Sequence, residues 1–320
     1  MTAVVDAVHR PEPSPQLSLT GRRTDWAGIA FAAALLFCLL VCFAFLMTLL
    51  VQVFADGWGT IAERGPEFLT SSLSTSPRRA GVAKGIKGSL MLAGFVALVA
   101  FPLGVATAVY LEEYAGDTRL TRIVRLNIRN LAGVPSVVYG LLGLSLFVKL
   151  LGSDMAGGKG LTGGRSLLSG GLTLAVLVLP VVIITASEAI RSVPSTLREG
   201  AYGLGATQWE VVRGIVLPNA VAGILTGTVL ALSRALGETA PLILTGAFFG
   251  NFLRTPNQSL LETVRGDYTA LPMIIYNWAG EAKSQFKLEL APAAIIVLLA
   301  ITLLCNAGAV LLRARYERES

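Results

Sequence analysis

The chain has 320 residues, of which 53% are hydrophobic and 14% charged, and its mean hydropathy is +0.67. Soluble globular domains carry roughly 25% charged residues, so this composition excludes an ordinary soluble protein and indicates one embedded in membrane lipid. The net charge of +6 is spread between apolar segments, which favours loops facing lipid headgroups over a nucleic-acid surface. The single histidine, His9, excludes histidine-based catalysis and a histidine metal cluster.

Six apolar stretches dominate the chain after a polar start. Residues 1–25 are rich in proline and predict a disordered tail, which is no signal peptide because the apolar run behind it is too long. A helix needs about 20 apolar residues to cross a bilayer. The stretches of about this length are 26–54, 86–111, 131–151, 167–190, 219–248 and 291–312. The sequence therefore predicts an all-α membrane protein with six transmembrane helices, of which the third carries Pro135 near its start and Lys149 near its end.

Six spans place both termini on the same side of the membrane. If that side is the cytoplasm, the external loops are 55–85, 152–166 and 249–290, and residues 313–320 form a cytoplasmic tail. Lys and Arg divide almost evenly between the two sides, so charge alone does not decide the orientation. The last external loop holds an aromatic stretch at 276–278, which predicts a short helix at the membrane interface.

The segment between the fourth and fifth spans, about 196–214, is too polar to cross the membrane. Gly203 and Gly205 permit a sharp turn within it. We expect a short helix, a glycine turn and a second helix that ends at Pro218. An ordinary amphipathic linker is the alternative interpretation of this segment.

The spacing of residues in this segment resembles the coupling-loop signature of bacterial ABC importer permeases. One position departs from that signature, since Gly200 stands where the second residue is usually Ala. The resemblance implies a helix bundle of the MetI-like permease fold, with a cytoplasmic loop that docks on an ATPase subunit. The residues that it marks for ATPase coupling are Glu199, Gly200, Ala201, Gly205, Ile215, Leu217 and Pro218.

A narrower resemblance covers residues from about 86 to the end. The segments 110–115 (YLEEYA), 130–141 (NLAGVPSVVYGL), 234–241 (RALGETAP) and 270–276 (ALPMIIY) resemble phosphate-importer permeases of the PstA type. The sister PstC type is similar, but the sequence GETAP at 237–241 favours the PstA type. One departure lies in the fourth span, where Ile184 and Ser187 replace a charged pair and leave Glu188 and Arg191 as its charges.

The resemblance implies the permease subunit of an ATP-driven phosphate importer in the bacterial inner membrane. Its implied partners are a homologous permease of the PstC type, two ATPase subunits of the PstB type and an external phosphate-binding protein of the PstS type. The chain itself lacks an ATP-binding P-loop, since the nearest candidate, 152–160, has Gly158 in place of the required Lys. We therefore expect no catalytic residue, no cofactor and no metal site in this chain.

Two charged residues lie midway along the fifth apolar stretch. Arg234 and Glu238 are four residues apart and would share a helix face and pair. A charge at the bilayer centre costs about 2.5 kcal/mol or more, so such residues usually face a bundle interior or a water-filled path. Two interpretations stay open: a structural ion pair, or a translocation-pathway site where the guanidinium contacts phosphate.

Gly223 and Gly227 precede this pair on the same predicted helix. Their small-xxx-small spacing permits a close helix contact, which is a packing feature and a candidate part of the interface with the partner permease.

Three other functions compete with phosphate import. The coupling loop fits an importer of another oxyanion, such as molybdate or sulfate, equally well. A secondary transporter or channel would work without ATP, and a co-purifying ATPase would separate that class. A membrane scaffold or sensor is disfavoured by the charged pair within the fifth stretch.

Overall fold

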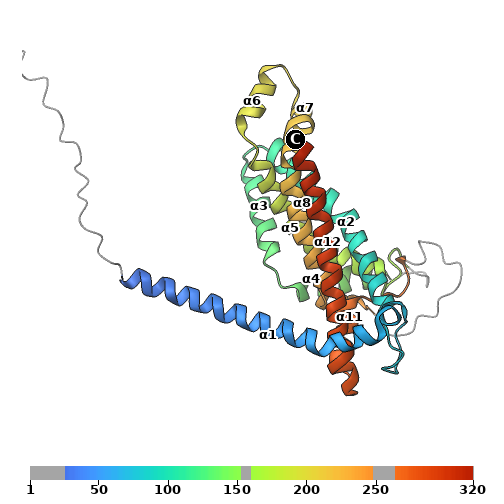
Figure 1. The fold of residues 1–320 in the computed structure, drawn as a ribbon. Helices are drawn as coiled ribbons and strands as arrows, with labels where there is room; N and C mark the ends of the chain where they lie inside the picture. Colours follow the sequence, from blue (N-terminus) through green and yellow to red (C-terminus); the bar gives the residue numbers. More distant parts are fainter. Residues whose placement is uncertain (1–25, 153–159, 248–263, 320) are drawn as a thin grey trace, which may run out of the picture. The chain divides into compact units, whose positions relative to one another are not determined.

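The computed structural model describes residues 26–152, 160–247 and 264–319, and these residues form helices and turns without a β-strand (Figure 1). The predicted tail, 1–25, lies outside them. The chain divides into two units, Met1–Val51 and Gln52–Ser320. The first helix, α1 (Trp26–Thr70), begins in the first unit, where its apolar side chains are exposed almost throughout. Such a surface is stable in lipid and unfavourable in water.

Four long helices build the second unit: α2 (Ala83–Val109), α5 (Leu167–Arg191), α8 (Leu217–Gly237) and α12 (Ala291–Glu319). The helix α5 packs against both α2 and α8, and α8 also packs against α12 (Figure 1). Two thirds of the apolar stretch of α5 is buried (67%), against one third of that of α2 (33%). The helix α5 is therefore the centre of the bundle, and the other helices turn apolar faces outward.

The structure contains five helices that are long and apolar enough to cross a membrane, or six if one bent pair counts as a single span, within its described residues. The bent pair is α3 (Arg119–Ala132) with α4 (Ser136–Gly143) and the π-helical η2 (Leu144–Leu150), at an angle of 101°. Pro135 explains the bend, because its ring removes a backbone donor and forces the preceding residue away from helical geometry. The third predicted stretch, 131–151, is therefore no single straight helix. It begins at the end of α3 and continues, after the bend at Pro135, as α4 and η2.

The fifth predicted span, 219–248, is also interrupted. The helix α8 ends at Gly237, and a short helix α9 (Ala240–Thr245) follows, while Phe248 lies outside the described residues. A continuous helix would press the ring of Pro241 against the carbonyl of Gly237, four residues earlier. The break therefore follows from Pro241, which the apolar run concealed.

The predicted external loops contain more helix than the sequence suggested. The helix α1 extends to Thr70, with a kink at Gly65 directly before Pro66, so only part of 55–85 is a loop. The helix α11 (Leu271–Ala279) lies in the predicted loop 249–290 and contains the aromatic stretch 276–278. Its Trp278 is fully buried, with ring centroids 6.3 Å from Phe68 and 5.7 Å from Phe286.

Two further boundaries differ at the C-terminal end. The π-helical η4 (Phe286–Leu290) leads directly into α12, so the sixth span begins before residue 291. The predicted tail 313–320 is helical as far as Glu319. The helices α8 and α12 run antiparallel, because Ser233 and Thr226 of α8 bond Asn306 and Arg313 of α12 respectively. The end of α12 therefore lies at the same end of the bundle as the start of α8 (Figure 1).

Gly223 and Gly227 face α5 of the same chain. A Cβ atom at Gly223 would lie 2.6 Å from Cβ of Ala189, and one at Gly227 would lie 2.1 Å from Oγ1 of Thr185. Both distances are far below van der Waals contact, so the glycines allow α8 to approach α5 closely. The prediction that they form an interface with a partner permease was wrong, since that face is already occupied within the bundle.

Candidate functional site

The predicted coupling loop forms the helix–turn–helix that the sequence indicated. The helix α6 (Ser195–Gly203) ends before Gly205, whose φ of 89° lies in the left-handed region that favours glycine. The backbone N–H groups of Gly205 and Ala206 donate to the carbonyl oxygens of Tyr202 and Ala201, at 2.9 and 3.1 Å. These bonds satisfy the last carbonyl groups of α6 and reverse the chain.

The second limb of the loop begins with a capping box. Thr207 precedes α7 (Gln208–Val211), and the carboxylate of Glu210 accepts from the backbone N–H and the hydroxyl of Thr207, each at 2.8 Å. These hydrogen bonds hold the pKa of Glu210 below its usual value. Because they favour the charged form, their contribution to loop stability is present above the unfolded-state pKa and is lost as the pH falls through the folded-state pKa.

Pro218 does not end the second limb, contrary to the prediction. The helix continues from α7 through the π-helical η3 (Val212–Val216) into α8, and Pro218 lies in the first turn of α8. Proline is tolerated there because the π turn before it, in which the N–H of Leu217 donates to the carbonyl of Val212, already interrupts the regular α-helical hydrogen-bond ladder. The second limb of the loop is thus continuous with α8 as one uninterrupted helical segment.

The seven signature residues fall into two places. Glu199 and Gly200 are exposed on α6, Ala201 packs against the bundle, and Gly205 makes the turn. Ile215, Leu217 and Pro218 lie instead at the root of α8, where the carbonyl oxygen of Ile215 accepts from Asn219 at 2.7 Å.

Three large side chains at the tip of the loop lie in solvent. The exposed fractions are 92% for Leu204, 56% for Trp209 and 44% for Tyr202. Aromatic residues are enriched at protein interfaces, and a cluster of exposed apolar residues on a polar loop is typical of a docking surface. We call Leu204, Trp209 and Tyr202 the loop tip.

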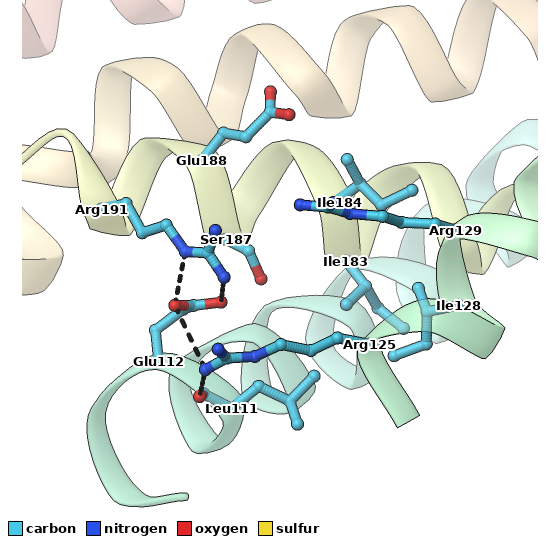
Figure 2. Close-up of a pocket in the computed structure, with 10 residues that line it drawn as sticks. All are labelled: Leu111, Glu112, Arg125, Ile128, Arg129, Ile183, Ile184, Ser187, Glu188 and Arg191. Atoms are coloured by element: carbon cyan, nitrogen blue, oxygen red, sulfur yellow. Dashed lines mark hydrogen bonds and ion pairs between the residues drawn. The ribbon is translucent and has the colours of Figure 1, made fainter. Parts of the chain in front are cut away.

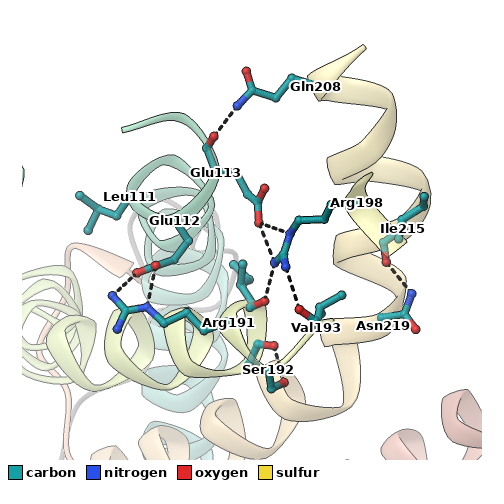
Figure 3. A network of polar contacts seen from close by, with 12 residues as sticks. Leu111, Glu112, Glu113, Arg191, Ser192, Val193, Arg198, Gln208, Ile215 and Asn219 are labelled. Carbon is teal, nitrogen blue, oxygen red and sulfur yellow. Dashed lines mark hydrogen bonds and ion pairs between the residues drawn. The ribbon is translucent and has the colours of Figure 1, made fainter. Parts of the chain in front are cut away.

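One carboxylate residue holds both limbs of the loop to the bundle. Glu113 lies in the π-helical η1 (Tyr110–Tyr114) at the end of α2, and its carboxylate accepts from Arg198 of α6 at 3.0 and 3.3 Å (Figure 3). The backbone carbonyl of Glu113 accepts from the side-chain amide of Gln208 in the other limb. Arg198 also donates to the carbonyl groups of Ile190 and Val193, at 2.9 and 2.7 Å.

The neighbouring carboxylate joins three helices. Glu112 accepts two hydrogen bonds from Arg191 at the end of α5, at 2.7 and 3.0 Å, and Arg125 of α3 lies 3.5 Å away. The side chains of Glu112 and Glu113 are each only 7% exposed, so both are well shielded from water. The sequence analysis included Glu112 and Glu113 only within the segment 110–115, which resembles PstA-type permeases. Two adjacent acids directly after an apolar run were the signal that could have identified them.

Arg234 and Glu238 do pair, although not along a continuous helix. The Nε atom of Arg234 lies 3.2 Å from Oε1 of Glu238, but Glu238 is the extended residue that follows the end of α8 at Gly237. Arg234 in the last turn also complements the negative end of the helix dipole. Its side chain is 38% exposed, against 17% for Glu238, so the pair leaves part of the guanidinium accessible.

Known proteins resemble this chain over most of its length. Residues 100–318 match the family described as "Binding-protein-dependent transport system inner membrane component". "Phosphate transport system permease protein PstA 1" of Mycobacterium tuberculosis is 37% identical over 72% of this chain and 70% of its own length. "Phosphate transport system permease protein PstA" of Xylella fastidiosa is 33% identical over 80% of this chain and 83% of its own.

The fold also resembles a solved structure. A chain from a bacterial ABC transporter involved in the import of alginate superposes with a TM-score of 0.60 at 18% identity, over 91% of this chain and 96% of that chain.

Proposed function

The chain belongs to the family of binding-protein-dependent transport system inner membrane components, and on that premise we propose that it is the permease subunit of an ATP-driven phosphate importer. It is a multi-pass membrane protein with the fold of an ABC importer permease. The observation that carries the transport mechanism is the loop tip, an exposed and largely apolar surface on a loop that the Glu113–Arg198 ion pair fixes to the bundle. The names of its relatives support phosphate as the substrate.

The proposed assembly has four kinds of component. A homologous permease of the PstC type completes the pathway, two ATPase subunits of the PstB type bind the loop tips, and an external binding protein of the PstS type delivers phosphate. The loop and both termini lie in the cytoplasm, which agrees with the end of α12 lying beside the start of α8.

The network at Glu112 and Glu113 provides the mechanical link in this proposal. When ATP binding draws the ATPase subunits together, they displace the loop. The ion pair of Glu113 with Arg198 carries this displacement to the end of α2, and that of Glu112 with Arg191 carries it to α5. The central helix and its neighbour then move with the loop, and access to the pathway switches between the two sides.

Arg234 is the proposed phosphate contact in this pathway. A guanidinium can donate two hydrogen bonds at once to an oxyanion, and Glu238 reduces its charge enough to let phosphate leave. The seven signature residues, Glu199 to Pro218, remain the proposed coupling set.

Uptake of radiolabelled phosphate tests the function directly. Cells that lack this chain should regain ATP-dependent uptake when it is restored, and unlabelled phosphate should compete far better than sulfate or molybdate. Gly205→Glu should reach the membrane yet give no uptake, because the left-handed turn disfavours any side chain. Preferential competition by sulfate or molybdate would transfer the assignment to another oxyanion, and uptake independent of ATP would remove the ABC mechanism.

The orientation has its own test. A cysteine at Gln208, which is exposed in the loop, should react with a membrane-impermeant maleimide only after the cells are opened. The variant should be made in a chain without Cys38, Cys42 and Cys305, since these thiols are free. Labelling from outside intact cells would reverse the proposed topology.

A further inference from the structure

A small cavity lies where η1, α3 and α5 meet (Figure 2). Its volume is about 30 Å³, and its wall includes Arg125 and Arg129 of α3, Glu112 of η1, and Ser187 and Arg191 of α5. The ion pairs of Glu112 connect it to the root of the coupling loop. The cavity is separate from the loop tip and from Arg234. The proposed function uses Glu112 and Arg191 of its wall as an ion pair but assigns no ligand to the cavity.

The wall of this cavity carries an excess of positive charge. Three guanidinium groups face two carboxylates there, and one of these, Glu112, is shared between Arg125 and Arg191. The other, Glu188, points away from Glu112 across α5 (Figure 2). Arginine stays protonated in proteins, so the excess charge cannot be removed by titration. A site with this balance attracts an anion.

Two arginines have donors left over. The Nε atom of Arg125 is buried and has no hydrogen-bond partner among the described residues, although its terminal nitrogen reaches Glu112 and the carbonyl oxygen of Leu111. Arg129 makes no hydrogen bond or ion pair with any residue that the structure describes, and it extends from α3 toward α5 beside Ile184 (Figure 2). An acceptor in the cavity would supply the partner that the buried Nε donor of Arg125 lacks.

We propose that this cavity binds a phosphate-type oxyanion. Arg125 and Arg129 donate to its oxygens, and the hydroxyl of Ser187 lies on the same wall. The space is about that of one water molecule, so one oxygen enters the cavity and the rest of the anion lies at its mouth. Inorganic phosphate and the phosphate group of a membrane lipid share this chemistry. The proposal rests on the geometry of the cavity and does not depend on the transport function.

Arg129→Gln is the informative variant, and Arg119→Gln is its matched control. Both remove one exposed arginine from α3, but only Arg129 lines the cavity. Since Arg129 contacts no described residue through a polar bond, its replacement should leave the unfolding temperature in chloride unchanged, and this baseline verifies folding. The measurement is the rise in unfolding temperature of the full chain, purified in neutral detergent without its binding protein, with inorganic phosphate at constant ionic strength.

The two sources of phosphate give different results. If the ligand is inorganic phosphate, added phosphate raises the unfolding temperature of the wild type and of Arg119→Gln. Arg129→Gln then needs about tenfold more phosphate for the same rise, because it has lost one charged hydrogen bond to the anion. If it is a lipid, phosphate has no effect, but native mass spectrometry finds phosphatidylglycerol retained by the wild type and Arg119→Gln and lost from Arg129→Gln. Equal behaviour of the two variants in both measurements would overturn the proposal.

Discussion

Arg198→Gln is expected to destabilise the coupling loop strongly and to separate ATP hydrolysis from phosphate uptake. Glu113 is 7% exposed and Arg198 19%, so the substitution leaves a largely buried carboxylate without its charged partner. Breaking a buried ion pair in this way costs about 3 to 5 kcal/mol. It also frees the carbonyl oxygens of Ile190 and Val193, which Arg198 holds. The loss should appear as a lower unfolding midpoint and faster proteolysis of the loop.

The exposed ion pair of Arg122 with Asp117 is the matched control. Its side chains are 73% and 78% exposed at a separation of 3.5 Å, so Arg122→Gln should change stability by less than about 1 kcal/mol. Equal effects of the two substitutions would show that Glu113 and Arg198 are no special anchor.

The double variant Arg198→Gln with Glu113→Gln distinguishes a structural role from a mechanical one. Neutralising both partners removes the unpaired charge, so most of the stability should return. The number of phosphate ions imported per ATP hydrolysed should remain low, because the loop has lost its rigid link to α2. Full recovery of this ratio would limit the pair to a structural role.

Local signals in the sequence predicted the local structure well. The helix–turn–helix of the coupling loop follows from Gly205 and from the Thr207–Glu210 capping box, which act within a few residues. The breaks after Ala132 and Gly237 follow from Pro135 and Pro241 in the same way. Counting apolar residues concealed the break at Pro241, because proline is itself compatible with an apolar run, whereas Pro135 already marked the third stretch as irregular.

Contacts between distant segments could not be predicted from one sequence. Glu113 and Arg198 are 85 residues apart, and Glu112 and Arg191 are 79 apart, so no periodicity relates them. The glycine spacing at Gly223 and Gly227 indicated a close helix contact correctly but contained no information about which helix fills it. The same limit explains the missed burial of Trp278, whose contacts Phe68 and Phe286 lie in other helices.

Phosphate uptake is expected to fail in Arg234→Gln while the complex still assembles. The Arg234 side chain is 38% exposed, so losing it should destabilise the chain by less than the loss of a fully buried partner would. The cap of α8 also weakens only modestly, since a cation at a helix end contributes about 0.3 to 1 kcal/mol. Co-purification of the partner permease and ATPase should therefore be normal. Arg122→Gln, remote from this pair, is the control for uptake.

Adding Glu238→Gln decides between the two interpretations of the pair. If Arg234 and Glu238 form only a structural ion pair, the double variant removes both charges and should restore uptake. If Arg234 contacts phosphate, uptake should stay absent, because neutralising the carboxylate supplies no donor. Arg234→Lys refines this result, since lysine keeps the charge but cannot donate two hydrogen bonds in one plane, and it should retain only weak uptake. We expect no recovery in the double variant; recovery would assign Arg234 to helix packing.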